Sequence, residues 1–312
     1  MMAAGRWGAA LLVCLLVAGC GARRRTTPPP AAPALATPAL AVPADLDIAM
    51  RLDLGRMRAE LGEHARRALG ARQQGGSDSG QTRLTNEALL RANTVWLGFR
   101  PGLPADLTDN VLVLRGDFEG FDPEGFEADP PWGMPRDLGG GWRRYERPPA
   151  ATRAAAVRVY QQHDDLLVLV STAEVDAVER ALERGQTDGG VQVPNAGTIA
   201  LAARGPALAG YFVKQLPSVA RLLRATPHVA ARLDLPVGRV HGEIELELVD
   251  EASATTMAHA FEELIELGRQ HRDLQPMAAG ASVEAVGRDV VVRLDMGGEA
   301  LAYVAALLAG DT

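Results

Sequence analysis

The chain carries the same order of local patterns twice, and this order restricts the folds that it can adopt. Two β-type runs, 154–160 and 166–171, are separated by a short polar turn and followed by a charged helical segment, 173–184. Near the C-terminus, two runs between residues 281 and 295 flank a Gly-Arg-Asp turn and precede a second helical segment, 299–308. We therefore predict an α+β fold with two similar subdomains, whose antiparallel sheets are covered on one face by helices.

The remaining patterns complete each subdomain. A strand at 47–53 leads into helical spacing at 54–69, and a strand at 198–203 leads into a long apolar helix at 206–224. Further strands and helices are expected between these segments of the sequence. We expect strands at 94–100, 110–116 and 239–249, and helices at 84–91 and 253–271.

Two aspartates stand at similar strand-to-helix corners. The sequence Arg-Leu-Asp-Leu-Gly around Asp53 is echoed by Arg-Leu-Asp-Met-Gly around Asp295. A carboxylate at such a corner can accept hydrogen bonds from the free amides of the first helical turn. We therefore expect both residues to cap helices.

Composition excludes several classes of function. The chain has 312 residues, of which 47% are hydrophobic and 23% charged, as in soluble globular domains. A net charge of −7 gives no general attraction to phosphate, so nucleic acid is not an expected partner. The cysteines, Cys14 and Cys20, both lie in the apolar leader, and thiol chemistry is therefore not expected in the folded body.

The N-terminus has the pattern of a signal peptide. Arg6 precedes an apolar run of about ten residues, which is too short to span a bilayer comfortably. The run ends in Leu-Val-Ala-Gly-Cys at 16–20, which resembles the lipobox of bacterial lipoproteins with a type II signal peptide. The resemblance covers only residues 1 to about 22 and implies cleavage of residues 1–19 and lipidation of Cys20 by acyl chains such as palmitate.

The resemblance also implies an address in the cell envelope. Gly21 and Ala22 follow the cysteine, and neither is the aspartate that retains such lipoproteins at the inner membrane, so the outer membrane is favoured, with the body at the periplasm or the cell surface. Residues 20–44 include six prolines and are expected to form an extended tether. The two subdomains are then expected at 45–186 and 187–312.

No segment carries a catalytic or cofactor motif, and we predict no cofactor and no metal. His259 and Glu263 are one helical turn apart, and His163 precedes two aspartates, but neither arrangement has the spacing of a metal site. The Gly-Ser-Asp-Ser-Gly sequence at 76–80 places an aspartate where the nucleophilic serine of an esterase elbow would stand. The patterns thus favour a protein that is not an enzyme.

The segment 117–145 is the most unusual part of the body, because it combines acidic residues with aromatic residues among Gly and Pro. We expect a long loop there that contacts a partner, since aromatic side chains often anchor protein interfaces. The alternative is that these side chains pack on their own body. The candidate contact residues are Phe118, Phe121, Phe126, Trp132, Trp142 and Tyr145.

The leading hypothesis is a non-enzymatic, membrane-anchored lipoprotein that binds another component of the envelope. One alternative is a carrier or sensor of an apolar ligand, for which the apolar helix would line a cleft. Its candidate residues are Leu208, Tyr211, Phe212, Leu216, Val219 and Leu223. A second alternative is a hydrolase whose site assembles only in the fold.

Overall fold

A computed structural model gives the fold of most of the body. It describes residues 38–43, 45–60, 80–100, 109–126, 130–148, 156–184, 196–213, 217–236, 238–271 and 275–297. The signal peptide, Cys20 and the helix expected at 299–308 lie outside the described residues. Among the described residues the chain forms two compact units, taken separately below: an N-terminal unit of residues 38–46 and 52–184, and a C-terminal unit of residues 47–51 and 196–297.

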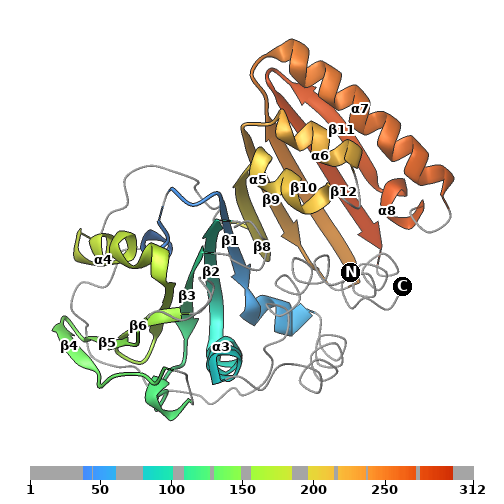
Figure 1. Cartoon of the computed structure of the whole chain (residues 1–312). Coiled ribbons are helices and arrows are strands. Elements are labelled where there is room, and N and C mark those ends of the chain that lie inside the picture. The colour runs from blue at the N-terminus through green and yellow to red at the C-terminus, as the bar shows by residue number, and fades with distance from the viewer. Residues whose placement is uncertain are drawn as a thin grey trace. The chain divides into compact units, whose positions relative to one another are not determined.

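The N-terminal unit is built on an antiparallel sheet (Figure 1). In order across the sheet, its strands are β2 (Ala92–Arg100), β3 (Asp109–Gly116), β7 (Leu166–Ser171), β6 (Ala156–Gln162), β5 (Trp142–Glu146) and β4 (Arg136–Gly139). Its helical elements are η1 (Pro38–Ala41), α3 (Gly80–Arg91), η2 (Pro123–Gly125), η3 (Thr172–Glu174) and α4 (Val175–Arg184). Residues 54–60 are also helical, and the Asp53 carboxylate caps them by accepting a 2.9 Å hydrogen bond from the Arg56 amide.

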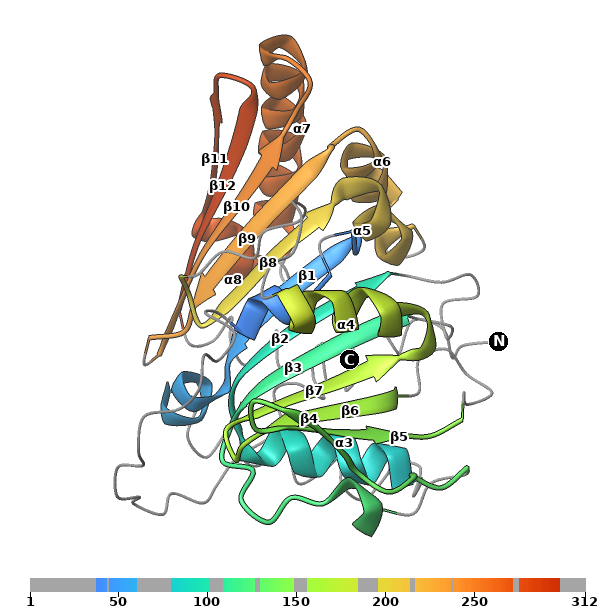
Figure 2. The ribbon, with the colours of Figure 1, turned by 90° about the vertical axis from the view of Figure 1, so that its left-hand side faces the viewer.

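Both faces of this sheet are buried, whereas the strand alternation predicts burial of one face only. All six residues of β7 are buried, so its side chains meet a cover on each side. One cover is α4 with η1, where Val175 and Val178 pack in the same cluster as Val111 and Val168. Figure 2 shows α4 in front of the strands and α3 behind them, and the buried Leu84 belongs to this second cover.

Residues 38–43, which lie within the expected tether, are described and pack in the N-terminal unit. Ala41, Val42 and Leu46 are 0%, 7% and 1% exposed and belong to the core of the N-terminal unit. Gly98 on β2 makes room for them, because a Cβ atom there would overlap the side chains of Val42 and Leu46. The end of the proline-rich segment is therefore part of the core, not of the tether.

The strands of the C-terminal unit are likewise hydrogen-bonded side by side. Across the sheet, the strands are β11 (Ala281–Val286), β12 (Asp289–Gly297), β10 (Arg239–Glu247), β9 (His228–Asp234), β8 (Ile199–Arg204) and the start of β1 (Ile48–Asp53). Its helices are α5 (Gly205–Phe212), α6 (Pro217–Arg224), α7 (Glu251–Gln270) and α8 (Gln275–Ala279). The neighbouring strands from β11 to β8 pair antiparallel.

Helices cover one face of this sheet (Figures 1 and 2). The other face carries charged side chains. On the covered face, Leu246 and Val290 pack against Ala220 of α6 and Met257 of α7. The other face carries a ladder of charges across four strands. Glu284 lies 2.7 Å from Arg293, Arg293 lies 3.6 Å from Glu243, and Glu243 lies 2.8 Å from Arg232.

The two units share a strand order, which confirms the prediction of an α+β fold with two similar antiparallel subdomains. The order β2-β3-β7-β6 in the N-terminal unit matches the order β9-β10-β12-β11 in the C-terminal unit. The units differ in the chain between β3 and β6 and in its counterpart between β10 and β11. That chain forms α7 and α8 in the C-terminal unit, whereas in the N-terminal unit it contains η2 and the β4–β5 hairpin.

Three local predictions were wrong. The helix expected at 206–224 is two helices, because Pro217 begins α6 and its ring disfavours helical continuation from the preceding residues. Asp295 caps no described helix, since it lies inside β12, where its carboxylate is 2.8 Å from Arg239 and 3.3 Å from His241. The segment 117–145 is not a structureless loop, because β4 and the start of β5 form a hairpin within it.

Candidate binding site

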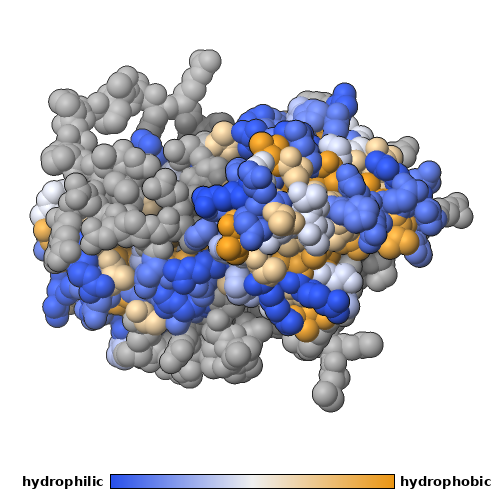
Figure 3. All heavy atoms as spheres, turned by 90° about the horizontal axis from the view of Figure 1, so that it is seen from above, coloured by the Kyte–Doolittle hydropathy of each residue, from blue (hydrophilic) through white to orange (hydrophobic). Residues whose placement is uncertain are grey.

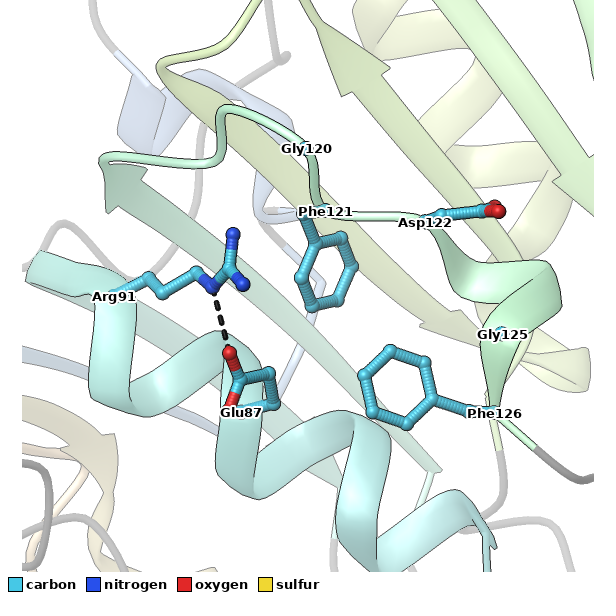
Figure 4. Close-up of a pocket in the computed structure, with 7 residues that line it drawn as sticks. All are labelled: Glu87, Arg91, Gly120, Phe121, Asp122, Gly125 and Phe126. Atoms are coloured by element: carbon cyan, nitrogen blue, oxygen red, sulfur yellow. Dashed lines mark hydrogen bonds and ion pairs between the residues drawn. The ribbon is translucent and has the colours of Figure 1, made fainter.

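A pocket of about 280 Å³ opens between α3 and the chain that follows β3 in the N-terminal unit (Figure 4). Helix α3 contributes Glu87 and Arg91, which are one turn apart and therefore share a face of the helix. The opposite wall comes from residues 120–126. The lining residues are Glu87, Arg91, Gly120, Phe121, Asp122, Gly125 and Phe126.

Backbone contacts hold this second wall against α3. Gly116, at the end of β3, packs directly on α3, because a Cβ atom there would overlap the backbone of Arg91 and Ala92. The next residue, Asp117, donates its amide to the Arg91 carbonyl at 3.1 Å. Gly120 has a φ of +67°, a conformation that glycine adopts without strain, and it turns the chain toward the pocket.

A buried phenylalanine supports the exposed end of the wall. Phe118 is fully buried, and its amide donates to the Asp164 carbonyl at 2.8 Å. Its ring meets Phe121 edge-on at 5.9 Å between centroids, and Phe121 in turn contacts Phe126 at 5.6 Å. The three rings therefore run from the core to the pocket, and Phe126, at the outer end, is only partly buried.

Arg91 is held by three contacts around the pocket. Its Nε donates to Glu87 Oε1 at 2.8 Å, and one terminal nitrogen donates to the Glu119 carbonyl at 2.9 Å. The guanidinium also lies over the ring of Phe121, 5.6 Å from its centroid. This arrangement is a cation–π contact, so the aromatic wall already stabilises one positive charge.

Acidic residues outnumber basic ones in the lining. Glu87 and Asp122 are set against the single guanidinium of Arg91. Asp122 also caps η2, since its Oδ1 accepts a 3.0 Å hydrogen bond from the Glu124 amide. The neighbouring Glu119 and Glu124 are exposed and add further negative charge beside the pocket.

The structure divides the six aromatic residues predicted to contact a partner. Phe118, Phe121 and Tyr145 are buried in the protein, so partner contact stays a prediction for the partly exposed Phe126, Trp132 and Trp142. Of these three, Phe126 alone lines the pocket.

The two tryptophans lie against their own unit. Trp142 packs on the core cluster below α4. Trp132 lies under the guanidinium of Arg147, 5.1 Å from the ring centroid. Arg147 is itself buried, and this burial lowers the pKa of its guanidinium. Both indole rings thus serve the packing of the N-terminal unit.

Sequence reasoning missed Glu87 and Arg91. Their spacing of four residues is a usable signal for an ion pair on one face of a helix. Nothing in the sequence places that face beside Phe121, because the two segments meet only through the packing of α3 on β3.

A second cluster of ionisable groups joins α4 to the sheet. The carboxylate of Glu179 accepts hydrogen bonds from the Tyr160 hydroxyl at 2.8 Å, from Arg144 at 3.1 Å and from Arg158. Burial raises the pKa of Glu179, but the hydrogen bonds from these donors outweigh burial and hold that pKa below its usual value. Burial also raises the pKa of Tyr160, so this hydroxyl stays a donor at neutral pH.

The residues of the apolar-ligand alternative pack mainly in their own core. Leu223 is buried in the C-terminal core cluster, and Leu208 and Val219 pack against it. Tyr211 is half-buried. Leu216 lies outside the described residues, as does the side chain of Phe212.

The remaining candidates concern metals and membranes. His259 lies 3.4 Å from Glu262 and 3.5 Å from Glu263 on the exposed side of α7, and no group of three metal-ligating side chains occurs within the described ranges. None of the helices in those ranges is long and apolar enough to cross a bilayer. On the face shown in Figure 3, hydrophobic and hydrophilic areas alternate over the described surface.

The fold places the chain in a class: an antiparallel α+β protein made of two units with the same strand order. No protein-family model matches the chain, and no curated protein matches it in sequence. Among solved structures, crystal form IV of TP0453 is similar, with a TM-score of 0.51, 12% identity, and coverage of 88% of this chain and 96% of that one. Crystal form I of TP0453 gives a TM-score of 0.49 and 14% identity, with 87% and 97% covered. At these identities the likeness to form IV concerns the fold alone.

Proposed function

We propose that this chain is a lipid-anchored protein of the bacterial envelope that binds another envelope component without catalysing a reaction. The pocket beside α3 would be the contact site. The observation that carries this proposal is the construction of the pocket, in which the partly exposed ring of Phe126 stands among charged groups and rests on buried aromatic rings.

The lining offers binding contacts. Its seven residues present two aromatic rings, two carboxylates and a guanidinium, and they include no hydroxyl, thiol or imidazole. Partly exposed aromatic rings beside charged groups are typical of the anchor points of protein interfaces. Because Phe126 rests on Phe121 and Phe118, the site is formed before a partner arrives, which lowers the entropic cost of binding.

The pocket has room for a side chain of a larger partner. Pockets for drug-sized ligands usually measure about 300 to 1,000 Å³ and enclose most of the ligand. A volume of about 280 Å³ lies just below this range and suits a single side chain of a larger partner.

The anchor is supported by the sequence around Cys20. The Leu-Val-Ala-Gly-Cys segment resembles a lipobox, and two or three acyl chains on Cys20 would hold a protein at a membrane. The absence of aspartate at positions 21 and 22 favours the outer membrane in a cell with two membranes.

Site-specific photocrosslinking tests the contact site in cells that express the full chain. A benzophenone amino acid replaces Phe126 in one variant and Leu138 in the control. Leu138 is 49% exposed in β4 and does not line the pocket. We expect one protein to be crosslinked from position 126 and not from position 138, and to be identified again when the crosslinker is placed at position 122.

Metabolic labelling of the same cells tests the anchor. Cys20→Ser should abolish labelling with a clickable palmitate analogue. Equal crosslinking from positions 126 and 138 would contradict the contact site, and undiminished labelling of Cys20→Ser would contradict the lipid anchor.

A further inference from the structure

We infer that the pocket beside α3 receives an arginine side chain from a basic segment of a protein partner. This inference rests on the proposed function, because it names the chemistry of the partner at the same site. It follows from the charge, the aromatic wall and the volume of the pocket.

The charge of the site favours a cation. The lining contains two carboxylates, Glu87 and Asp122, and one guanidinium, that of Arg91, whose charge is already compensated by Glu87 at 2.8 Å. Glu119 and Glu124 beside the lining are exposed. An anionic ligand would meet four carboxylates and an arginine that is engaged, whereas a cation is attracted on approach.

The aromatic wall favours a planar cation. The site already holds one guanidinium over an aromatic face, since Arg91 lies 5.6 Å from the centroid of Phe121. Phe126 is the next ring outward, and in Figure 4 its side chain points toward Glu87. A guanidinium entering from solvent can therefore stack on Phe126 in the way that Arg91 stacks on Phe121.

Hydrogen bonding distinguishes arginine from a quaternary ammonium group. The Glu87 carboxylate accepts one hydrogen bond from Arg91, through Oε1. Because a carboxylate has about four acceptor positions, it can accept further hydrogen bonds from a ligand. A guanidinium supplies N–H donors to such a carboxylate, and a choline headgroup supplies none. The volume of about 280 Å³ accommodates one such side chain.

A direct binding assay on the full chain in detergent micelles tests the inference. The probe is the dye-labelled peptide Gly-Ser-Gly-Arg-Gly-Ser-Gly, followed by fluorescence anisotropy. The matched probe replaces arginine by citrulline, which keeps the shape and removes the charge. We expect the citrulline peptide to bind at least about tenfold more weakly, because hydrogen bonds between charged groups contribute roughly twice as much as neutral ones.

Variants assign the effect to the pocket. Glu87→Gln should weaken arginine binding by about tenfold, and Phe126→Leu by about threefold, the range of an exposed cation–π contact. The control Glu263→Gln changes an exposed glutamate of α7 in the other unit, 68% exposed, and should leave binding unchanged. Urea midpoints for all three variants separate lost binding from lost folding.

Each outcome decides the question. Equal binding of the arginine and citrulline peptides, or an equal effect of Glu87→Gln and Glu263→Gln, overturns the inference. Displacement of the arginine peptide by phosphocholine would assign the site to a choline cation instead. Crosslinking of a partner at position 126 without binding of the arginine peptide would leave the proposed function in place and refute this inference alone.

Discussion

Truncation of Leu46 tests whether the end of the proline-rich segment belongs to the core. The Leu46 side chain is 1% exposed, and its Cδ1 atom lies 2.6 Å from the point where a Cβ of Gly98 would stand. Neighbouring residues on a sheet cannot close such a gap fully, so Leu46→Ala should leave a cavity. Truncations of buried leucines cost about 2 to 5 kcal/mol, and we expect about 3 kcal/mol here.

Urea unfolding followed by tryptophan fluorescence reports on the stability of the N-terminal unit. Trp96, Trp132 and Trp142 all lie in the N-terminal unit, and the fourth tryptophan, Trp7, lies in the leader. With a slope of about 2 kcal/mol per molar urea, the midpoint should fall by about 1.5 M. The control Leu138→Ala, at a residue 49% exposed, should cost less than about 0.5 kcal/mol. Equal midpoints for the two variants would refute the assignment of Leu46 to the core.

Two further predictions concern the helices that pack on the sheet of the N-terminal unit. Gly116→Ala should destabilise this unit by about 2 kcal/mol, because the new Cβ meets the backbone of Arg91. The control is Gly125→Ala, whose Cβ meets no atom within 4 Å. Thermal melting that ranks the two variants the other way would contradict the packing of α3 on β3. Because the pKa of Glu179 is lowered in the folded state, its stabilisation is present above the unfolded carboxyl pKa of about 4.3 and is lost as the pH falls through the folded value. Glu179→Gln should therefore weaken the unit at neutral pH and flatten the pH dependence of the urea midpoint below pH 4.3, and an unchanged acid profile would argue against the hydrogen-bonded network.

Local patterns were sufficient for most of the secondary structure, because the strands alternate clearly and are bounded by polar turns. The polar sequence 161–165 contains the turn between β6 and β7, which is residues 163–165, and the Asp53 corner is correctly identified as a helix cap. Asp295 has nearly the same neighbours in sequence, yet it lies in a strand. Its cross-strand contacts with Arg239 and His241 decide its environment, and no local pattern contains them.

Other elements escaped prediction because their residues do not show the expected pattern. Strand β9 is His-Val-Ala-Ala-Arg-Leu-Asp, in which alanine blurs the alternation, and β4 is wholly exposed, so it has no apolar face to detect. The candidate site was half predicted. Phe121 and Phe126 were singled out as unusual aromatic residues, whereas Glu87 and Arg91 become part of the site only because α3 packs against β3.

The burial of Ala41, Val42 and Leu46 has a mechanical consequence for an anchored protein. Cys20 and Pro38 are 38 − 20 = 18 residues apart, so with the proposed lipid on Cys20 the tether between lipid and body could not exceed about 65 Å. A pull on the anchor would reach the buried segment first, where Arg100 also binds Asp45 at 3.0 Å. Release of residues 38–46 would lengthen the tether by 46 − 38 = 8 residues, or about 28 Å, before the load reached β1.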